Sequence, residues 1–325
     1  MNTTSLPRPL DRAIADYLAH YRALGRAYDQ EESVLGLMRT FLAKKGVADL
    51  DREYFDLWRR SFSTLHPNSR HTYERIVYNF CRYRRRSSPR GFLPDPASLA
   101  QPIPHALPTP IGTAQIAKVL ELASKLSPTS GSPLRAAVMR MALVLLHTSG
   151  LRLGELLRLR LDDVDPRTGV LRIRESKFHR SRWVPLSPSA RSELSRYLTI
   201  RQKLCRDGHP GAPLLCHRGR GWRAYGPTGM HQALHALFEA AGVRGPDGRC
   251  PRVHDLRHGF AVEALRRWYA EGADVQVNLP KLALYMGHVS IVSTAYYLRW
   301  MPEVIARASE RFERHCGTLV SGERR

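Results

Sequence analysis

Apolar residues recur at helical spacing through residues 11 to about 90. The clearest stretch places its apolar side chains three or four positions apart: Val34, Leu37, Met38, Phe41 and Leu42. Acidic residues precede this stretch at Glu31 and Glu32, and Gly46 ends it. This pattern predicts a helix with one buried face, in a region that is helical as a whole.

A second helix is predicted to begin near Asn68, with an apolar face and basic flanks. Its apolar face consists of Tyr73, Ile76, Val77 and Phe80. Its basic residues are Arg70, His71, Arg75, Arg82, Arg84, Arg85 and Arg86. Two interpretations fit: a solvated surface helix whose dipole favours cations near its end, or a helix that faces the phosphates of a nucleic acid.

Prolines crowd the stretch from 94 to 110, at positions 94, 96, 102, 104, 108 and 110. This density excludes a regular helix or a central strand and is typical of an extended, semi-rigid linker. We therefore predict a helical domain over residues 1–95, a linker over 96–111 and a second domain over 112–325.

The second domain mixes two periodicities. An apolar helix is predicted over 134–147 and a short one over 151–160, while alternation over 170–174 and 182–186 predicts a β-hairpin with its turn near 177–181. Further helices are expected at about 188–205, 227–241, 254–270, 279–286, 293–299 and, as a tail, 303–315. The predicted fold class is mainly α with a small antiparallel β-sheet.

The charge balance points to a polyanionic partner. Lys and Arg total 51 against 29 Asp and Glu, which gives a net charge of +22. Hydrophobic residues at 43% are ordinary for a globular protein, so a disordered basic tail is excluded. Nucleic acid is the first expectation, and we predict that Arg70, Arg75, Arg82, Arg84, Arg85 and Arg86 contact DNA.

The N-terminal segment, the apolar runs and the cysteines predict where the protein is located and whether it binds a metal. Residues 1–11 carry no apolar signal segment and no run of 18 apolar residues occurs, so we expect a cytoplasmic, nucleoid-associated protein without membrane contact. The five cysteines stand apart, which predicts reduced thiols. The pair Cys216 and His217 has no partner pair at zinc spacing, so no metal and no cofactor are predicted.

Four short segments carry the candidate chemistry. Arg152 follows Ser149-Gly150 at the start of a predicted helix, and Lys177 lies in the predicted hairpin. His254 and Arg257 lie three residues apart on one helix face, and His288 is followed nine residues later by Tyr297. Two arginines and a histidine that converge form an anion site suited to a phosphodiester, where guanidinium groups stabilise the charge of the transition state. Tyrosine offers a nucleophile and lysine a proton for the leaving oxygen.

Together these segments resemble the tyrosine recombinases, the phage-integrase type of site-specific recombinase. The matching motifs are Ser149-Gly150-Leu151-Arg152 with Glu155-Leu156, Lys177, His254-Asp255-Leu256-Arg257-His258, Met286-Gly287-His288 and Tyr297. The likeness spans roughly residues 112–316. It implies a helical core-binding domain followed by a mixed α/β catalytic domain. Ser149 stands where the family usually has Thr, and Leu298-Arg299 follows Tyr297 where a Tyr-x-His is common.

The resemblance implies a role for each matching residue. Arg152 and Arg257 would clamp the scissile phosphate, with His288 donating to it and His254 donating or assisting proton transfer. Lys177 would protonate the 5′-hydroxyl leaving group, and Tyr297 would attack to form a 3′-phosphotyrosyl bond. Arg180 and Arg182 are neighbouring alternatives to Lys177, but the high pKa of arginine makes them poor proton donors. Glu155 and His258 would support the site without touching DNA. Tyr296 is adjacent, but neighbouring side chains on a helix point about 100° apart, so only one of the two tyrosines can face the phosphate. The nine-residue step from His288 selects Tyr297.

The resemblance also implies partners, and it leaves open how the tail packs and which of three functions the chain has. It implies a homotetramer on two synapsed DNA sites, alone or with other recombinases, and a role in integration or transposition of a mobile element. The apolar stripe Val304, Ala308 and Phe312 fits either packing on its own domain or docking on a neighbour. Two other functions fit the same pattern: a non-catalytic DNA-binding regulator, and a type IB topoisomerase-like enzyme.

Overall fold

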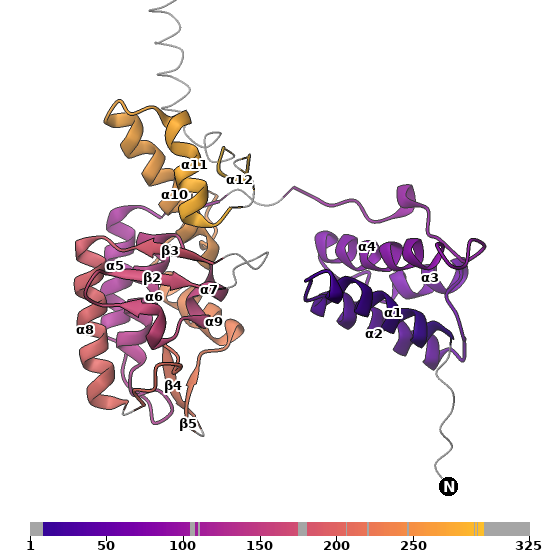
Figure 1. Ribbon diagram of the computed structural model, residues 1–325, viewed down its shortest axis with the longest axis horizontal. Helices are drawn as coiled ribbons and strands as arrows, with labels where there is room; N and C mark the ends of the chain where they lie inside the picture. Colours follow the sequence, from indigo (N-terminus) through magenta and orange to yellow (C-terminus); the bar gives the residue numbers. More distant parts are fainter. Residues whose placement is uncertain are drawn as a thin grey trace, which may run out of the picture. The chain divides into compact units, whose positions relative to one another are not determined.

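The structure is a computed structural model that divides the chain into two compact units, Met1–Ala106 and Leu107–Arg325 (Figure 1). It describes residues 9–104, 108–109, 111–174, 181–205, 207–219, 221–245, 247–288, 290 and 292–295. Lys177, Tyr296, Tyr297 and the predicted tail helix lie outside the described residues. Each unit is described by itself below.

Four α-helices make up most of the described part of the first unit, as the apolar spacing predicts. They are α1 (Pro9–Ala23), α2 (Asp29–Lys44), α3 (Arg52–Arg60) and α4 (Pro67–Arg84). Helix α3 begins where the side chain of Asp51 accepts a hydrogen bond from the backbone N–H of Tyr54. On α4, Val77 and Phe80 are fully buried in the shared core, as predicted. On α2, Met38 is buried as predicted, but Leu37 is 53% exposed and Leu35 takes its place in the core.

The proline-rich stretch begins on the surface of the first unit. After a single 3₁₀ turn at Pro96–Ser98, the backbone N–H of Ala100 donates to Glu74 at 2.7 Å and that of Ile103 donates to Asn68 at 2.8 Å. Leu99 is buried against the helical core. Residues 99–103 therefore lie along α4, and the units divide after Ala106.

Eight helices of the second unit are described. They are α5 (Thr113–Ser124), α6 (Arg135–Ser149), α7 (Leu153–Arg158), α8 (Pro188–Leu204), α9 (Pro227–Ala240), α10 (Val253–Ala270), α11 (Val275–Met286) and α12 (Val292–Ala295). Helix α6 is apolar on nearly every side because it contacts α5, α7, α8, α9 and α10. It is the central element on which the unit is assembled.

The predicted hairpin is confirmed, and it is part of a three-stranded sheet. Strands β2 (Val170–Ile173) and β3 (Arg182–Pro185) pair antiparallel, with Ile173 opposite Arg182. Strand β1 (Val164–Asp165) adds to the free edge of β2. The sequence does not predict a second antiparallel pair, β4 (Cys216–Gly219) and β5 (Gly221–Ala224), because these short, mostly exposed strands lack alternation.

Two helix predictions need correction. The sequence pattern does not predict α5, because the proline-rich segment directly before it obscures the apolar positions Ile116, Val119 and Ala123. Helix α11 begins at Val275 rather than 279, since the Asp274 carboxylate caps it by accepting from the N–H groups of Gln276 and Val277. Pro280 is accommodated inside this helix.

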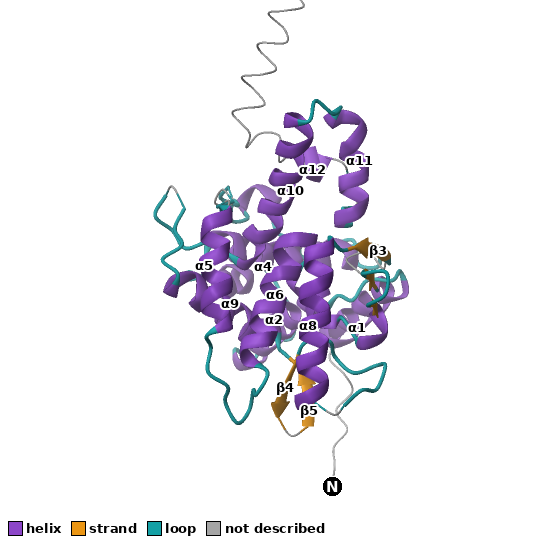
Figure 2. Cartoon of the chain, turned by 90° about the vertical axis from the view of Figure 1, so that its left-hand side faces the viewer, coloured by secondary structure: helices purple, strands orange, loops and turns teal. Residues whose placement is uncertain are grey.

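The fold class is confirmed: the chain is mainly α with a small antiparallel β-sheet. Helices α10 and α11 lie side by side and share a small apolar cluster of their own, including Leu265, Leu282 and Met286 (Figure 2). No helix among the described residues is both long enough and apolar enough to cross a membrane.

Candidate functional site

The site begins at the glycine that ends α6. Gly150 has φ +59°, and a Cβ atom there would lie 2.5 Å from the ring of Phe260 on α10. Glycine is thus required both by the left-handed backbone and by the close approach of α10. Two residues later, Arg152 stands at the N-cap of α7.

Arg152 links α7 to the end of α11. Its guanidinium group donates to Glu155 Oε1 at 2.8 Å and to the carbonyl oxygen of Gly287 at 3.1 Å. The side chain is 26% exposed, so part of the guanidinium group still faces solvent. The i to i+3 spacing of Arg152 and Glu155, visible in the sequence, makes this pair possible.

Arg257, on α10, is almost completely enclosed. It is 2% exposed and donates to the carbonyl oxygens of Gly150 at 2.5 Å and Met286 at 2.7 Å. Arg257 therefore ties the turn after α6 to the last turn of α11.

Arg182, on β3, is a third arginine of the site. Its guanidinium group donates to both oxygens of Glu155, at 3.2 and 2.9 Å, and to the carbonyl oxygen of Tyr285 at 2.8 Å. Its side chain is only 7% exposed. From the sequence, Arg182 is only a poor candidate for a proton donor; its partner Glu155 is 27 positions away, and spacing gives no signal for the pair.

Three successive carbonyl groups at the end of α11 thus each accept from a different arginine. Tyr285 pairs with Arg182, Met286 with Arg257 and Gly287 with Arg152. A helix C-terminus carries unsatisfied carbonyls and partial negative charge, so it attracts cations. The arrangement gathers three guanidinium groups around the residue that follows, His288.

Glu155 is the carboxylate that holds two of these arginines. Its side chain is 1% exposed. Burial alone would raise its pKa, but hydrogen bonds and charge from Arg182, with further hydrogen bonds from Arg152, lower the pKa to about 2. The carboxylate is therefore ionised at neutral pH and fixes the orientation of both guanidinium groups.

His288 follows the left-handed cap residue Gly287. Its Nδ1 lies 2.7 Å from Oγ1 of the buried Thr294, on α12. Burial, together with the charges of Arg257, Arg152 and Arg182, lowers the pKa of His288 to about 4. The imidazole is thus neutral at neutral pH and can donate a hydrogen bond from only one of its nitrogens.

His254 and His258 lie one turn apart at the start of α10. Their rings meet edge to face, with centroids 4.7 Å apart. The His254 side chain reaches solvent, but neighbouring protein atoms surround part of its ring. This partial burial, together with the charge of Arg257, lowers the pKa of His254. Burial and His254 lower the pKa of His258 to about 4. Buried Asp255 caps the helix by accepting from the backbone N–H of Arg252 at 2.8 Å.

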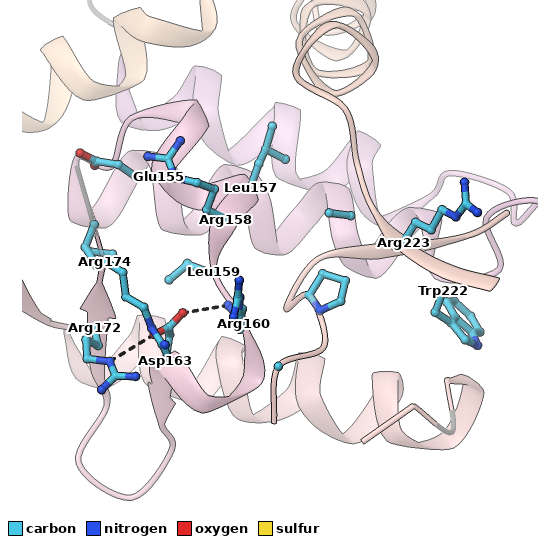
Figure 3. A pocket seen from close by; sticks show the side chains of 14 residues that line it. Glu155, Leu157, Arg158, Leu159, Arg160, Asp163, Arg172, Arg174, Trp222 and Arg223 are labelled. Carbon is cyan, nitrogen blue, oxygen red and sulfur yellow. Dashed lines mark hydrogen bonds and ion pairs between the residues drawn. The ribbon is translucent and has the colours of Figure 1, made fainter. Parts of the chain in front are cut away.

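A pocket of about 890 Å³ lies against α7, with Glu155 at its wall, and is lined by arginines (Figure 3). Asp163 neutralises part of it, accepting from the guanidinium groups of Arg172 and Arg174. Arg158, Arg160 and Arg223 are exposed, and none forms an ion pair with an acidic residue of the described chain. The lining arginines outnumber the two lining carboxylates, Glu155 and Asp163, so the pocket is positively charged.

The basic residues of α4 fall into two kinds. Arg75, Arg82, Arg85 and Arg86 are exposed and Arg70 is half-buried. Arg84 instead forms a two-bond ion pair with Asp49, with both contacts at 2.7 Å. Of the six arginines predicted to contact DNA, Arg84 is thus the one held in an ion pair within its own unit.

The structure brings together Arg152, Glu155, His254, Arg257, His258 and His288, all named from the sequence. Sequence reasoning considers Arg182 only as a poor alternative to Lys177, misses its pairing with Glu155, and does not identify Thr294 as a site residue. Thr294 gives no signal, because a lone threonine near a histidine is common. Lys177 and Tyr297 are outside the described residues, so their assigned roles stay predictions.

Comparison with known sequences gives matches along the chain. The model of the phage integrase family matches residues 114–303. The putative integrase/recombinase y4rE of Sinorhizobium fredii is 32% identical over 329 residues, covering 95% of this chain and 97% of that protein. The tyrosine recombinase XerD of Xanthomonas campestris pv. campestris is 32% identical over 211 residues, covering 62% of this chain and 59% of that protein.

Solved structures share the fold at low identity. The XerH site-specific recombinase, in a post-cleavage complex with its palindromic difH substrate, has a TM-score of 0.61 at 18% identity, covering 86% of this chain and 78% of that chain. The Tn1549 transposon integrase, in complex with transposon right end DNA, has a TM-score of 0.60 at 14% identity, covering 89% and 94%.

Proposed function

Because this chain belongs to the phage integrase family and is thus a site-specific recombinase, we propose that it cuts and rejoins DNA strands through a 3′-phosphotyrosyl intermediate. One observation supports the proposal above the others. Arg152, Arg257 and His288 are held around the end of α11 by direct hydrogen bonds. Such a cluster of fixed donors suits one phosphate group whose charge increases in the transition state.

The arginines divide the work: Arg152 acts on the phosphate, and Arg257 and Arg182 hold the site together. The Arg152 side chain is 26% exposed, and its pairing with Glu155 fixes the direction of its guanidinium group. Guanidinium groups that are oriented before the substrate binds stabilise a pentacoordinate phosphorus without costly rearrangement. Arg257 and Arg182 hold the carbonyls of α11 and so keep His288 in place.

His288 contributes one hydrogen bond of defined direction. We assign Nδ1 as the acceptor from the hydroxyl group of Thr294, 2.7 Å away, which would leave the single imidazole proton on Nε2. This tautomer donates to a non-bridging phosphate oxygen. Because the ring is neutral at neutral pH, it acts as a hydrogen-bond donor rather than as a cation.

The covalent step uses the two residues assigned by the family motif. The phenolic oxygen of Tyr297 forms a bond to the scissile phosphorus while the bond from phosphorus to the 5′ oxygen breaks. The phenol proton passes to a neighbouring base, a role suited to His254, and Lys177 donates a proton to the departing 5′ oxygen. Attack by a 5′-hydroxyl of another strand reverses these steps and rejoins the DNA.

The decisive experiment compares wild-type protein with Tyr297→Phe. A binding site is first selected from a pool of random duplexes, and a nicked suicide version of it then traps covalent complexes. Wild-type protein is expected to form an adduct that survives denaturing electrophoresis. Tyr297→Phe is expected to bind the same duplex with similar affinity and to form no adduct, since only the attacking oxygen is removed.

Other outcomes would replace the proposal. Binding by wild-type protein without any adduct would favour the regulator. Relaxation of a supercoiled plasmid that lacks the selected site would favour the topoisomerase-like enzyme. An undiminished adduct in Tyr297→Phe, together with its loss in Tyr296→Phe, would move the nucleophile by one position.

We also propose that the biological role is integration or transposition of a mobile element, by a tetramer on two DNA sites. Putative integrases/recombinases y4rE and y4rB match 95% and 93% of this chain, whereas the match to XerD covers 62%. Light scattering after size-exclusion chromatography would test assembly: four protein chains and two duplexes are expected in the synapsed complex. Repeats flanking the gene would support the mobile element.

A further inference from the structure

We propose that His235, Glu239 and Cys250 form a zinc-binding site on the second unit, apart from the arginine cluster. The imidazole, carboxylate and thiol ligand atoms of these three residues all lie within 4.8 Å of one another. His235 and Glu239 are one turn apart on the same face of α9, and Cys250 lies in the segment that leads into α10. The proposal does not depend on the recombination chemistry.

The donor set selects the metal. Nitrogen, thiolate sulfur and carboxylate oxygen are the three ligand types that Zn²⁺ takes in proteins, at about 2.0 to 2.3 Å. In a tetrahedral site, ligand atoms at that distance from the metal lie roughly 3.3 to 3.8 Å from one another. Side-chain rotations that move the ligand atoms by about an ångström would therefore close the site. Mg²⁺ and Ca²⁺ prefer all-oxygen sites and fit poorly. A solvent molecule would take the fourth position, because Glu239 is exposed.

The charges balance when the thiol loses its proton. Cysteine binds Zn²⁺ as the thiolate, so the thiol of Cys250 must lose its proton when the metal binds. Binding of Zn²⁺ forms the Zn–S bond and releases that proton to solvent. The divalent ion is then neutralised by one thiolate and one carboxylate.

One group opposes the metal. Arg244 lies 3.8 Å from Glu239, and both side chains are substantially exposed, at 43% and 52%. An exposed ion pair of this kind is weak and gives way to a bound divalent ion. Removing Arg244 is therefore expected to strengthen metal binding.

The site would secure the connection between α9 and α10. Cys250 is four residues before His254, and the intervening chain enters α10 through Pro251 and the cap at Arg252. The preceding loop contains two glycines with positive φ, Gly242 and Gly248. A metal that joins Cys250 to α9 would restrict this loop and so stabilise the start of α10.

Cobalt provides the direct test, because a thiolate bound to Co²⁺ gives a charge-transfer absorption in the near ultraviolet. Tag-free, reduced, full-length protein is titrated with Co²⁺ and then with Zn²⁺, which should displace it. Cys250→Ser should lose the absorption, and His235→Ala should lower Zn²⁺ affinity by more than the roughly 10- to 100-fold cost of losing an outer partner. Arg244→Ala should bind more tightly.

His231→Ala is the matched control. His231 is exposed on the same helix one turn before His235, with ring centroids 6.2 Å apart, but does not belong to the cluster. Its replacement should leave the absorption unchanged; an equal loss in this variant overturns the assigned ligands. A wild-type protein without the absorption, or Cys250→Ser with it, overturns the site itself.

A second measurement needs no variant, so it tests the site even if the substituted proteins fail to fold. In wild-type protein, Zn²⁺ should slow alkylation of Cys250, located by peptide mass spectrometry. Cys81, Cys205 and Cys216 are buried and serve as internal references. Equal alkylation of Cys250 with and without Zn²⁺ contradicts the proposal.

Discussion

At the scale of single residues, we expect the hydroxyl group of Thr294 to select the tautomer of His288. Thr294→Val keeps the shape of the buried side chain but removes the group 2.7 Å from Nδ1. The imidazole proton is then free to occupy either nitrogen. We expect the rate of adduct formation to fall about 10-fold or more while DNA affinity is unchanged.

Thr294→Ser is the matched control, because it retains the hydroxyl group. It should recover most of the wild-type rate of adduct formation, measured by rapid quench on the suicide duplex. Equal rates in the valine and serine variants would show that packing, and not the hydrogen bond, is what Thr294 provides.

The histidines of the site also predict how stability depends on pH. His258 and His288 both have a pKa near 4 in the folded protein, against an ordinary value of 6.5. Between these values the unfolded chain binds more protons, so the free energy of unfolding decreases as pH falls from about 6.5 to about 4. Glu155, with its pKa lowered to about 2, extends the loss below pH 4.5.

Calorimetric unfolding of the full chain across this pH range measures the effect in the transition of the second unit. His258→Gln removes one titrating group and should reduce the slope between pH 6.5 and pH 4. An unchanged slope in that variant would mean that other groups cause the acid sensitivity.

At the scale of elements, Arg182 connects β3 to both α7 and α11. Replacing it with alanine leaves the buried Glu155 carboxylate with Arg152 alone and the Tyr285 carbonyl without its guanidinium donor. Removing one partner of a buried ion pair costs about 3–5 kcal/mol, and the remaining arginine places the expected loss near 3 kcal/mol. Denaturant unfolding, followed in the transition of the second unit, measures it.

Two further variants separate charge from packing. Glu155→Gln added to Arg182→Ala removes the uncompensated charge, so the double variant should be more stable than the sum of the single losses. Arg196→Ala breaks an exposed pair with Glu193 and should cost less than about 1 kcal/mol. Additive losses at 155 and 182 would refute the coupling of these residues.

The elements also show what the sequence can predict. Helices α2 and α4 and the β2–β3 hairpin follow from local periodicity, which places each of them with nearly correct bounds. Helix α5 has the same kind of signal, but the prolines before it obscure it. Strands β4 and β5 have none, because they are held by pairing with each other, from Cys216 with Ala224 to Gly219 with Gly221.

The candidate site divides in the same way. Arg152, His254, Arg257 and His288 stand in short motifs, which spacing reveals. The hydrogen bonds that position them join residues far apart in the chain, such as Arg182 to Glu155 and Arg152 to Gly287, over 27 and 135 positions. Interactions of this kind depend on how β3, α7 and α11 pack together, so no local pattern contains them.

At the scale of the whole molecule, the net charge of +22 predicts DNA affinity that depends strongly on salt. Removing one side chain that neutralises a phosphate should reduce the slope of log K against log salt by about 0.9. Arg82 is exposed and lies over the ring of Tyr78, where its charge is available to a phosphate. Arg82→Gln is therefore expected to lower affinity and to reduce the slope by the amount that corresponds to a single phosphate.

Arg84 provides the control that makes this prediction specific, because it lies two residues away on the same helix and carries the same charge. Its guanidinium group is already paired with Asp49. Arg84→Gln should therefore keep the wild-type salt slope and instead lower the thermal stability of the first unit. Filter binding to one duplex across a range of salt concentrations distinguishes the two variants. Equal slopes in Arg82→Gln and Arg84→Gln would show that α4 acts through its total charge and that no single phosphate is contacted by Arg82.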